Sequence, residues 1–235
     1  MLKRTLRRLR KKIVDSCLIC GGSNLHCKCF ATFSMYEKAL LGGAPVGLIE
    51  HKISDFGKGQ EDNQIINSIK KRWVYIIDNI SKFIEVGKHL LVTGGHGEGK
   101  TMMSVILMKA AVLDGNHCVY KIFPDLMGIY LSKDNNPYEW LSLMECNALI
   151  IDELGMEIRS PAFEKDQVSK SKRFANHVLS RILKSRHDNK LTTIIISNMT
   201  KNEILEEYDE VVRSIIQSED FVHMAHGGKD FRGGK

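Results

Sequence analysis

The sequence predicts an α/β protein built on a doubly wound parallel sheet, and three observations support this prediction. Short apolar runs of strand length alternate along the chain with longer segments of helical apolar spacing. One strand leads through a glycine-rich turn into a helix without Gly or Pro. Another strand ends in a pair of acidic residues, at the edge where ligands bind in open parallel sheets.

The glycine-rich turn at 94–101 matches the pattern G-x-x-x-x-G-K-[ST] in full. It lies between an apolar strand at 89–93 and an apolar helix at 102–111. Glycines let successive backbone N–H groups surround a polyphosphate, and the helix adds the positive end of its dipole. The lysine is placed to reach the β- and γ-phosphates, and the threonine hydroxyl to help hold Mg²⁺. The predicted nucleotide-binding residues are Gly94, Gly95, His96, Gly97, Glu98, Gly99, Lys100 and Thr101.

Length and composition fit one α/β domain with a small appendage. A chain of 235 residues with 43% hydrophobic and 26% charged residues is typical of a soluble globular protein. No apolar run is long enough to span a bilayer, and the basic N-terminus lacks the apolar core of a secretory signal. We therefore expect a cytoplasmic protein without a membrane partner, whose six cysteines are reduced thiols or metal ligands.

The first segment of the chain is strongly basic and contains no acid up to residue 14. Apolar side chains recur at helical spacing at Leu2, Leu6, Leu9 and Ile13, with lysines and arginines between them. This pattern predicts a basic amphipathic helix. Its charge suits an anionic partner, either nucleic acid or an acidic protein surface, and its apolar stripe suits packing on the protein itself equally well.

Four cysteines come next, in two close pairs. Cys17 and Cys20 form a C-x-x-C pair, and Cys27 and Cys29 form a C-x-C pair after a turn with two glycines. Such pairs can bring four thiolates to the corners of a tetrahedron, which is the coordination that structural Zn²⁺ prefers. His26 is an alternative ligand, and thiols without a metal are the alternative to a zinc site.

The rest of the chain continues the alternation. A turn at 42–45 and glycines at 57 and 59 separate the Cys-rich segment from the helices and strands after it. We expect helices at 64–83, 125–131 and 173–186, and strands at 118–123, 148–151 and 192–198.

Three polar residues fall at the carboxyl ends of these strands. Asp152 follows four apolar residues and is placed as a Walker B acid that supports Mg²⁺. Glu153 is suited to orient or deprotonate the water that attacks the γ-phosphate, and Asn198 to position that water. A single acid at a strand end would be commonplace, but an Asp-Glu pair downstream of an intact phosphate loop favours a nucleoside triphosphatase.

In this combination the chain resembles the DnaC/DnaI/IstB group of AAA+ ATPases. The resemblance rests on the loop at 94–101, the run IDELG at 151–155 and the run ISN at 196–198, and it extends from about residue 44 to 213. It implies a five-stranded AAA+ sheet, ATP and Mg²⁺ as cofactors, and Asn198 as the sensor 1 residue.

The resemblance also implies a site shared between subunits of a homo-oligomer. In that family an arginine after the sensor strand acts on the neighbour's ATP, where a planar cation stabilises the transferring phosphoryl group. Arg213 matches this position best, and Arg186 is the alternative. Few residues follow Asn198, so we expect the helical lid of the family to be absent or minimal. Arg232 resembles a remnant of its sensor 2 arginine.

We divide the chain into a basic helix and Cys-rich module with a predicted Zn²⁺ site at 1–43, an ATPase core at 44–213 and a C-terminal tail at 214–235. The implied function is that of a helicase loader in DNA replication, which assembles on single-stranded DNA and recruits a replicative DNA helicase. An IstB-like transposition helper that binds duplex DNA is the alternative. A small-molecule kinase and a zinc-dependent adaptor with a nucleotide switch are further alternatives, and the Asp-Glu pair with a sensor asparagine speaks against the kinase.

Overall fold

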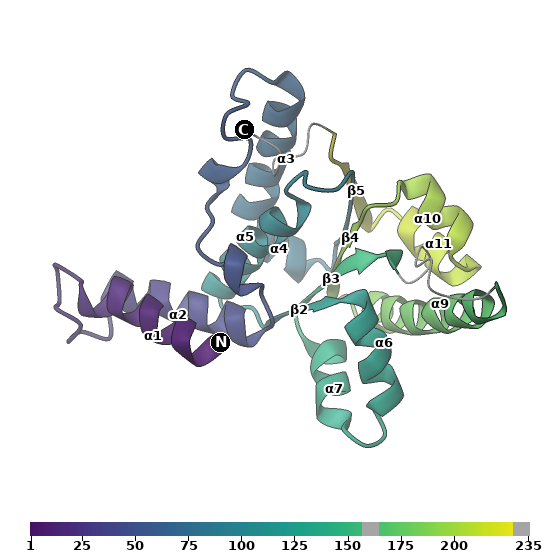
Figure 1. Ribbon diagram of the computed structural model, residues 1–235, viewed down its shortest axis with the longest axis horizontal. Coiled ribbons are helices and arrows are strands. Elements are labelled where there is room, and N and C mark those ends of the chain that lie inside the picture. Colours follow the sequence, from purple (N-terminus) through teal and green to yellow (C-terminus); the bar gives the residue numbers. More distant parts are fainter. Residues whose placement is uncertain (157–164, 228–235) are drawn as a thin grey trace.

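A computed structural model of the protein describes residues 1–156 and 165–227, with the side chains of 165–169 excepted. A five-stranded sheet forms its centre, with helices on both sides (Figure 1). The strand order is β2-β3-β4-β1-β5, and all neighbouring strands are parallel. This confirms the predicted five-stranded parallel sheet. The strands are β1 (His89–Thr93), β2 (Cys118–Ile122), β3 (Ala148–Leu154), β4 (Thr192–Ser197) and β5 (Phe221–Ala225).

Two apolar cores lie on opposite faces of the sheet, because successive strand residues point to opposite sides. Leu90 and Val92 belong to one core, whereas Leu91 between them belongs to the other. The first core packs against α2 (Lys28–Leu41), α3 (Gln64–Asp78), α4 (Ile80–Glu85) and α5 (Lys100–Leu113). The second packs against α6 (Phe123–Ser132), α7 (Pro137–Glu145), α9 (Lys165–Asp188), α10 (Lys201–Glu207) and α11 (Glu210–Gln217).

The predicted basic helix is present as α1 (Leu2–Arg10), which continues into a wider turn at Lys11–Asp15. Leu9 is buried in the first core, so the apolar stripe packs on the protein itself. The basic side chains all remain exposed: Lys3, Arg4, Arg7, Arg8, Arg10, Lys11 and Lys12. The Cys-rich module, residues 1–43, therefore packs through α2 against α5 and presents a cationic outer face.

One expected helix is interrupted in the structure, and one strand lies in a segment where no strand was expected. The helix expected at 64–83 is interrupted at Asn79, whose backbone leaves helical geometry while its side-chain amide donates to the Tyr75 carbonyl. The fifth strand, β5, lies in the segment assigned to the tail, and α11 runs across the boundary at 213. Because β5 is an edge strand with only two of its five side chains buried, its apolar pattern is weak. The parallel sheet therefore includes a strand from the segment assigned to the tail.

The C-terminal end adds little to this core within the described residues. No helix follows β5 up to residue 227, and the predicted sensor 2 residue Arg232 lies outside the described residues. In the described part of the chain, none of the helices is both long enough and apolar enough to cross a membrane.

Candidate nucleotide site and metal centre

The phosphate loop connects β1 to α5 at the carboxyl edge of the sheet. Gly94, Gly97 and Gly99 have φ angles of 154°, 74° and 77°, which side-chain-bearing residues rarely adopt. A Cβ at Gly94 would also lie 2.3 Å from Oε2 of Glu98. The loop leads directly into the N-terminus of α5, so the positive end of the helix dipole faces the site.

Lys100 is buried at the start of α5 and directs its ammonium group back over the loop. Its Nζ donates to the carbonyl oxygens of Gly94 and Gly95 at 2.9 and 2.5 Å. It also donates to Oδ1 of Asn198 at 2.8 Å, which joins the loop to the end of β4. The predicted lysine and the predicted sensor asparagine thus lie in contact.

Asp152 at the end of β3 accepts three hydrogen bonds in a buried position. The hydroxyls of Thr101 and Tyr120 both donate to its Oδ2, at 2.8 and 2.6 Å. The backbone N–H of Glu153 donates to its Oδ1 at 2.8 Å. A hydroxyl beside a carboxylate offers the hard oxygen ligands that Mg²⁺ prefers, so these residues fit a magnesium-bound nucleotide.

Glu153 has an unusual backbone conformation. Its φ is 60°, and the pairing of β3 with β4 shifts register between Ile151 and Leu154. Positive φ is uncommon outside glycine and costs about 1–3 kcal/mol of strain, which is found most often at functional sites. The irregularity leaves Asp152 buried and the next acid, Glu153, exposed at the site.

A cavity of about 520 Å³ contains the predicted catalytic residues Glu153 and Asn198 together with most of the loop. This volume lies in the range of small-molecule and cofactor sites. Its lining residues are Leu48, His51, Asp55, His96, Gly97, Glu98, Gly99, Lys100, Thr101, Met102, Asp152, Glu153, Met156, Ile196, Ser197 and Asn198. The motif residues chosen from the sequence are therefore brought to one place.

A buried histidine supports the loop from behind and was not singled out in the sequence. Nε1 of Trp73 donates to Nε2 of His226 at 2.7 Å, so Nδ1 of this ring carries the proton. This Nδ1 donates to the carbonyl of Glu98 at 3.0 Å. Burial lowers the pKa of His226 to about 4, which keeps the ring neutral at pH 7. Oε2 of Glu98 in turn accepts from the Gly95 N–H at 2.9 Å.

The two candidate arginines have opposite environments. Arg186 is 0% exposed and donates to the carbonyls of Leu143, Cys146 and Thr192 at 2.7, 3.0 and 2.6 Å. A guanidinium enclosed in this way cannot reach a neighbouring subunit, so Arg186 is a structural residue. Arg213 is exposed on α11, where its Nε donates to the Tyr208 carbonyl at 3.1 Å. It lies outside the cavity lining of its own chain.

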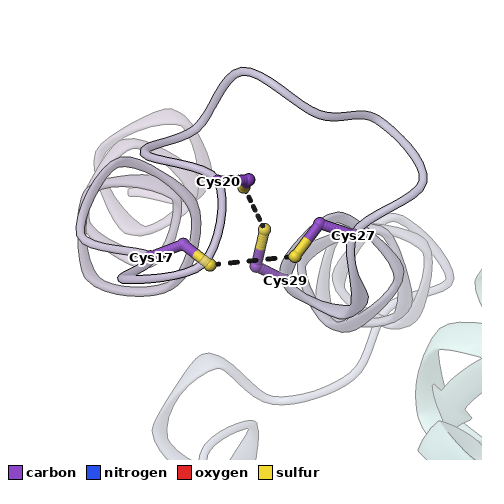
Figure 2. A group of neighbouring side chains, drawn as sticks. All are labelled: Cys17, Cys20, Cys27 and Cys29. Carbon is purple, nitrogen blue, oxygen red and sulfur yellow. Dashed lines mark hydrogen bonds between the residues drawn. The ribbon is translucent and has the colours of Figure 1, made fainter.

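The four N-terminal cysteines form one cluster (Figure 2). The Sγ atoms of Cys17 and Cys27 are 3.8 Å apart and those of Cys20 and Cys29 are 3.5 Å apart, and all four lie within 4.8 Å of one another. Tetrahedral Zn²⁺ with Zn–S bonds of about 2.3 Å places sulfur atoms about 3.8 Å apart, so the cluster fits this ion. His26 does not belong to this group of ligand atoms.

The backbone also favours a thiolate in this cluster. Hydrogen bonding from the backbone of Asn24 is the main cause that lowers the pKa of Cys20 to about 6. Desolvation by burial is the main cause that raises the pKa of Cys29 to about 12. A bound cation would hold both groups as thiolates, because thiolate is the form that ligates a metal.

Comparison with known proteins bears on the fold. No protein-family model and no curated protein matches the sequence. A solved structure of the DnaC helicase loader matches with a TM-score of 0.57 at 21% identity, over 70% of this chain and 92% of that chain. The chain therefore has the fold of this helicase loader structure.

Two further solved structures agree with this assignment. A DnaI structure matches with a TM-score of 0.54 at 15% identity, over 79% of this chain and 93% of that chain. A structure described as a primosome component from Streptococcus pyogenes serotype M3 matches with a TM-score of 0.58 at 16% identity, over 80% and 92% of the two chains. The predicted AAA+ fold is confirmed, while the roles of single residues stay predictions.

Proposed function

We propose that this chain is an ATP-dependent helicase loader in DNA replication, which assembles on single-stranded DNA and recruits a replicative DNA helicase. The observation that carries the proposal is the cavity in which the phosphate loop meets Asp152, Glu153 and Asn198. The fold shared with DnaC and DnaI supports the loader role over other uses of a phosphate loop.

Nucleotide binding is the first step, and it rests on the loop and the two oxygen donors beside it. The loop backbone and the N-terminus of α5 surround the phosphates, and the Lys100 ammonium moves from carbonyl oxygens to the β- and γ-phosphates. Thr101 and Asp152 are the residues that would hold Mg²⁺, which neutralises phosphate charge when bound.

Hydrolysis is assigned to Glu153 and Asn198. Glu153 is exposed to the cavity and accepts the proton of the attacking water. Asn198 holds that water in line, and its contact with Lys100 ties the water position to the phosphate-binding amine. The strained backbone at Glu153 supports this role, because strain of this kind is retained where it orients a reacting group.

Arg213 acts on the ATP of a neighbouring subunit in this proposal. Val212, Ile215 and Ile216 bury one side of α11, which leaves Arg213 on the outer side. An exposed arginine outside its own cavity suits delivery in trans, where it stabilises charge on the transferring phosphoryl group. The chain would then act as a homo-oligomer.

The Cys-rich module contributes a Zn²⁺ site and a cationic surface. Cys17, Cys20, Cys27 and Cys29 hold the ion, and the basic face of α1 contacts DNA phosphates or an acidic partner. Glu50 pairs with Arg8 at 3.5 Å and with Lys12 at 3.3 Å, so part of the basic face is already held against the core.

ATP hydrolysis by the full chain, with and without single-stranded DNA, tests the proposal together with capture of the replicative helicase of the same source. We expect hydrolysis that DNA stimulates, retention of the helicase, and loss of hydrolysis in Lys100→Ala. No helicase contact and no DNA effect would overturn the loader role. Stimulation by duplex DNA alone would favour a transposition helper instead.

A further inference from the structure

We propose that Tyr120 is a positioning residue that holds the magnesium-supporting acid Asp152 and links it to the Cys-rich module. The inference rests on the proposed ATPase function, and it concerns the regulation of that same site. The supporting observation is that the side chain and the backbone of Tyr120 contact two different parts of the molecule.

The side chain of Tyr120 reaches the nucleotide site from β2. Its buried hydroxyl donates to Oδ2 of Asp152 at 2.6 Å, the same oxygen that accepts from Thr101. The phenolic hydroxyl is the donor of this pair, because an ionised carboxylate offers only acceptor atoms. Donors to a carboxylate form strong hydrogen bonds, and several donors on one carboxylate fix its orientation. Tyr120 therefore sets the direction in which Asp152 presents its oxygens.

The backbone of Tyr120 faces the module. Its N–H donates at 2.7 Å to the carbonyl of Gly42, the residue that follows α2. A Cβ at Gly42 would lie 2.3 Å from the Cys118 carbonyl oxygen, and one at Gly43 would lie 2.4 Å from the Tyr120 carbonyl oxygen. Only glycines allow such an approach, so the end of the module rests directly on the edge of β2.

Helix α2 connects this contact to the metal centre. It begins at Lys28, between Cys27 and Cys29, and ends one residue before Gly42. A helix transmits a displacement at one end to the other, because its backbone is held by hydrogen bonds throughout. Events at the cysteines, such as metal loss or partner binding, therefore reach Tyr120 and Asp152 by one continuous path. Coupling of this kind is reciprocal, so nucleotide binding also stabilises the module.

Tyr120→Phe tests the link, because it keeps the ring and removes the hydroxyl. The measurement is binding of a fluorescent ATP analogue to the full chain with and without Mg²⁺. Binding without Mg²⁺ should stay unchanged, whereas the gain in affinity from Mg²⁺ should fall on the order of tenfold, the effect of one charge-assisted hydrogen bond. Tyr130→Phe is the matched control, since it removes a hydroxyl bonded to His177 at 2.8 Å away from the site.

The connection to the module is tested by a second substitution at the far end of α2. Cys27→Ser should reduce the gain in nucleotide affinity from Mg²⁺ (the Mg²⁺ response) in the wild-type background. In the Tyr120→Phe background it should cause little further reduction, because both substitutions act through one contact. An unchanged Mg²⁺ response in Tyr120→Phe, or effects of the two substitutions that simply add, would overturn the inference. A wild-type chain that binds no ATP would instead overturn the proposed function.

Discussion

The nucleotide site and the cysteine cluster are built in different ways. Lys100 and Asp152 are 6% and 4% exposed. They lie on α5 and β3, whose buried side chains belong to the apolar cores on the two faces of the sheet. The turns that carry the cysteines instead expose large apolar side chains, at Leu18, Ile19 and Leu25. The core therefore fixes the geometry of the nucleotide site. The cysteine turns have little core of their own, so we expect their fold to depend on an ion held by the four thiolates.

Removal of the metal should produce the largest loss of hydrogen-exchange protection, and this loss should centre on the cysteine turns of the module. Structural zinc contributes about 10–16 kcal/mol in small zinc-bound peptides, so chelation should abolish hydrogen-exchange protection in residues 17–29. The five strands should keep their protection, because their cores lie elsewhere. Strands that lose protection together with the turns would show that the two regions fold as one unit.

Glu153→Gln should separate hydrolysis from binding at the nucleotide site. Loss of a general base lowers the rate by about 10²–10⁴-fold, while the loop, Lys100 and Asp152 still bind nucleotide. Steady-state hydrolysis and equilibrium binding of ATP measure the two effects. If ATP binding fell as much as hydrolysis, Glu153 would be needed for the structure of the nucleotide site and not for catalysis.

The two arginines should differ in how much they contribute to the free energy of unfolding. Arg186→Met leaves several buried carbonyls without a donor, and each such group costs about 1–3 kcal/mol, so unfolding in urea should show a loss of about 3 kcal/mol or more. Arg213→Ala removes an exposed side chain and should change stability by less than about 0.5 kcal/mol. Equal losses of stability would contradict the assignment of Arg213 to an intersubunit role.

Stability should fall in mild acid because of His226. Its pKa is about 4 in the folded protein and 6.5 as the ordinary value, so between these values the unfolded chain binds more protons. The free energy of unfolding should therefore drop by up to about 3 kcal/mol from pH 6.5 to pH 4 on account of this residue. His89, whose pKa burial also lowers to about 4, adds to the same trend. Urea unfolding of the wild type and of His226→Gln measures how much of this drop is due to His226. If the free energy of unfolding changes with pH by the same amount in both proteins, His226 makes no contribution.

The sequence predicted those parts of the site that belong to short, recognisable motifs. A few neighbouring residues are enough to identify the loop at 94–101, the acids after β3 and the asparagine after β4. The contacts of Tyr120 and His226 depend on residues far away in the chain, such as Asp152 and Trp73, and no local pattern marks them. For the same reason the burial of Arg186 was not foreseen, and the strand β5 was missed because only two of its five side chains are buried.

Mixing two inactive variants tests the shared site most directly. Glu153→Gln lacks the proposed base but keeps Arg213, and Arg213→Ala keeps the base but lacks the proposed trans-acting arginine. In a mixture, an Arg213→Ala site beside a Glu153→Gln neighbour regains a complete set of residues. We predict that the mixture hydrolyses ATP clearly faster than the sum of the separate variants. A rate equal to that sum would contradict a site completed by the neighbouring subunit.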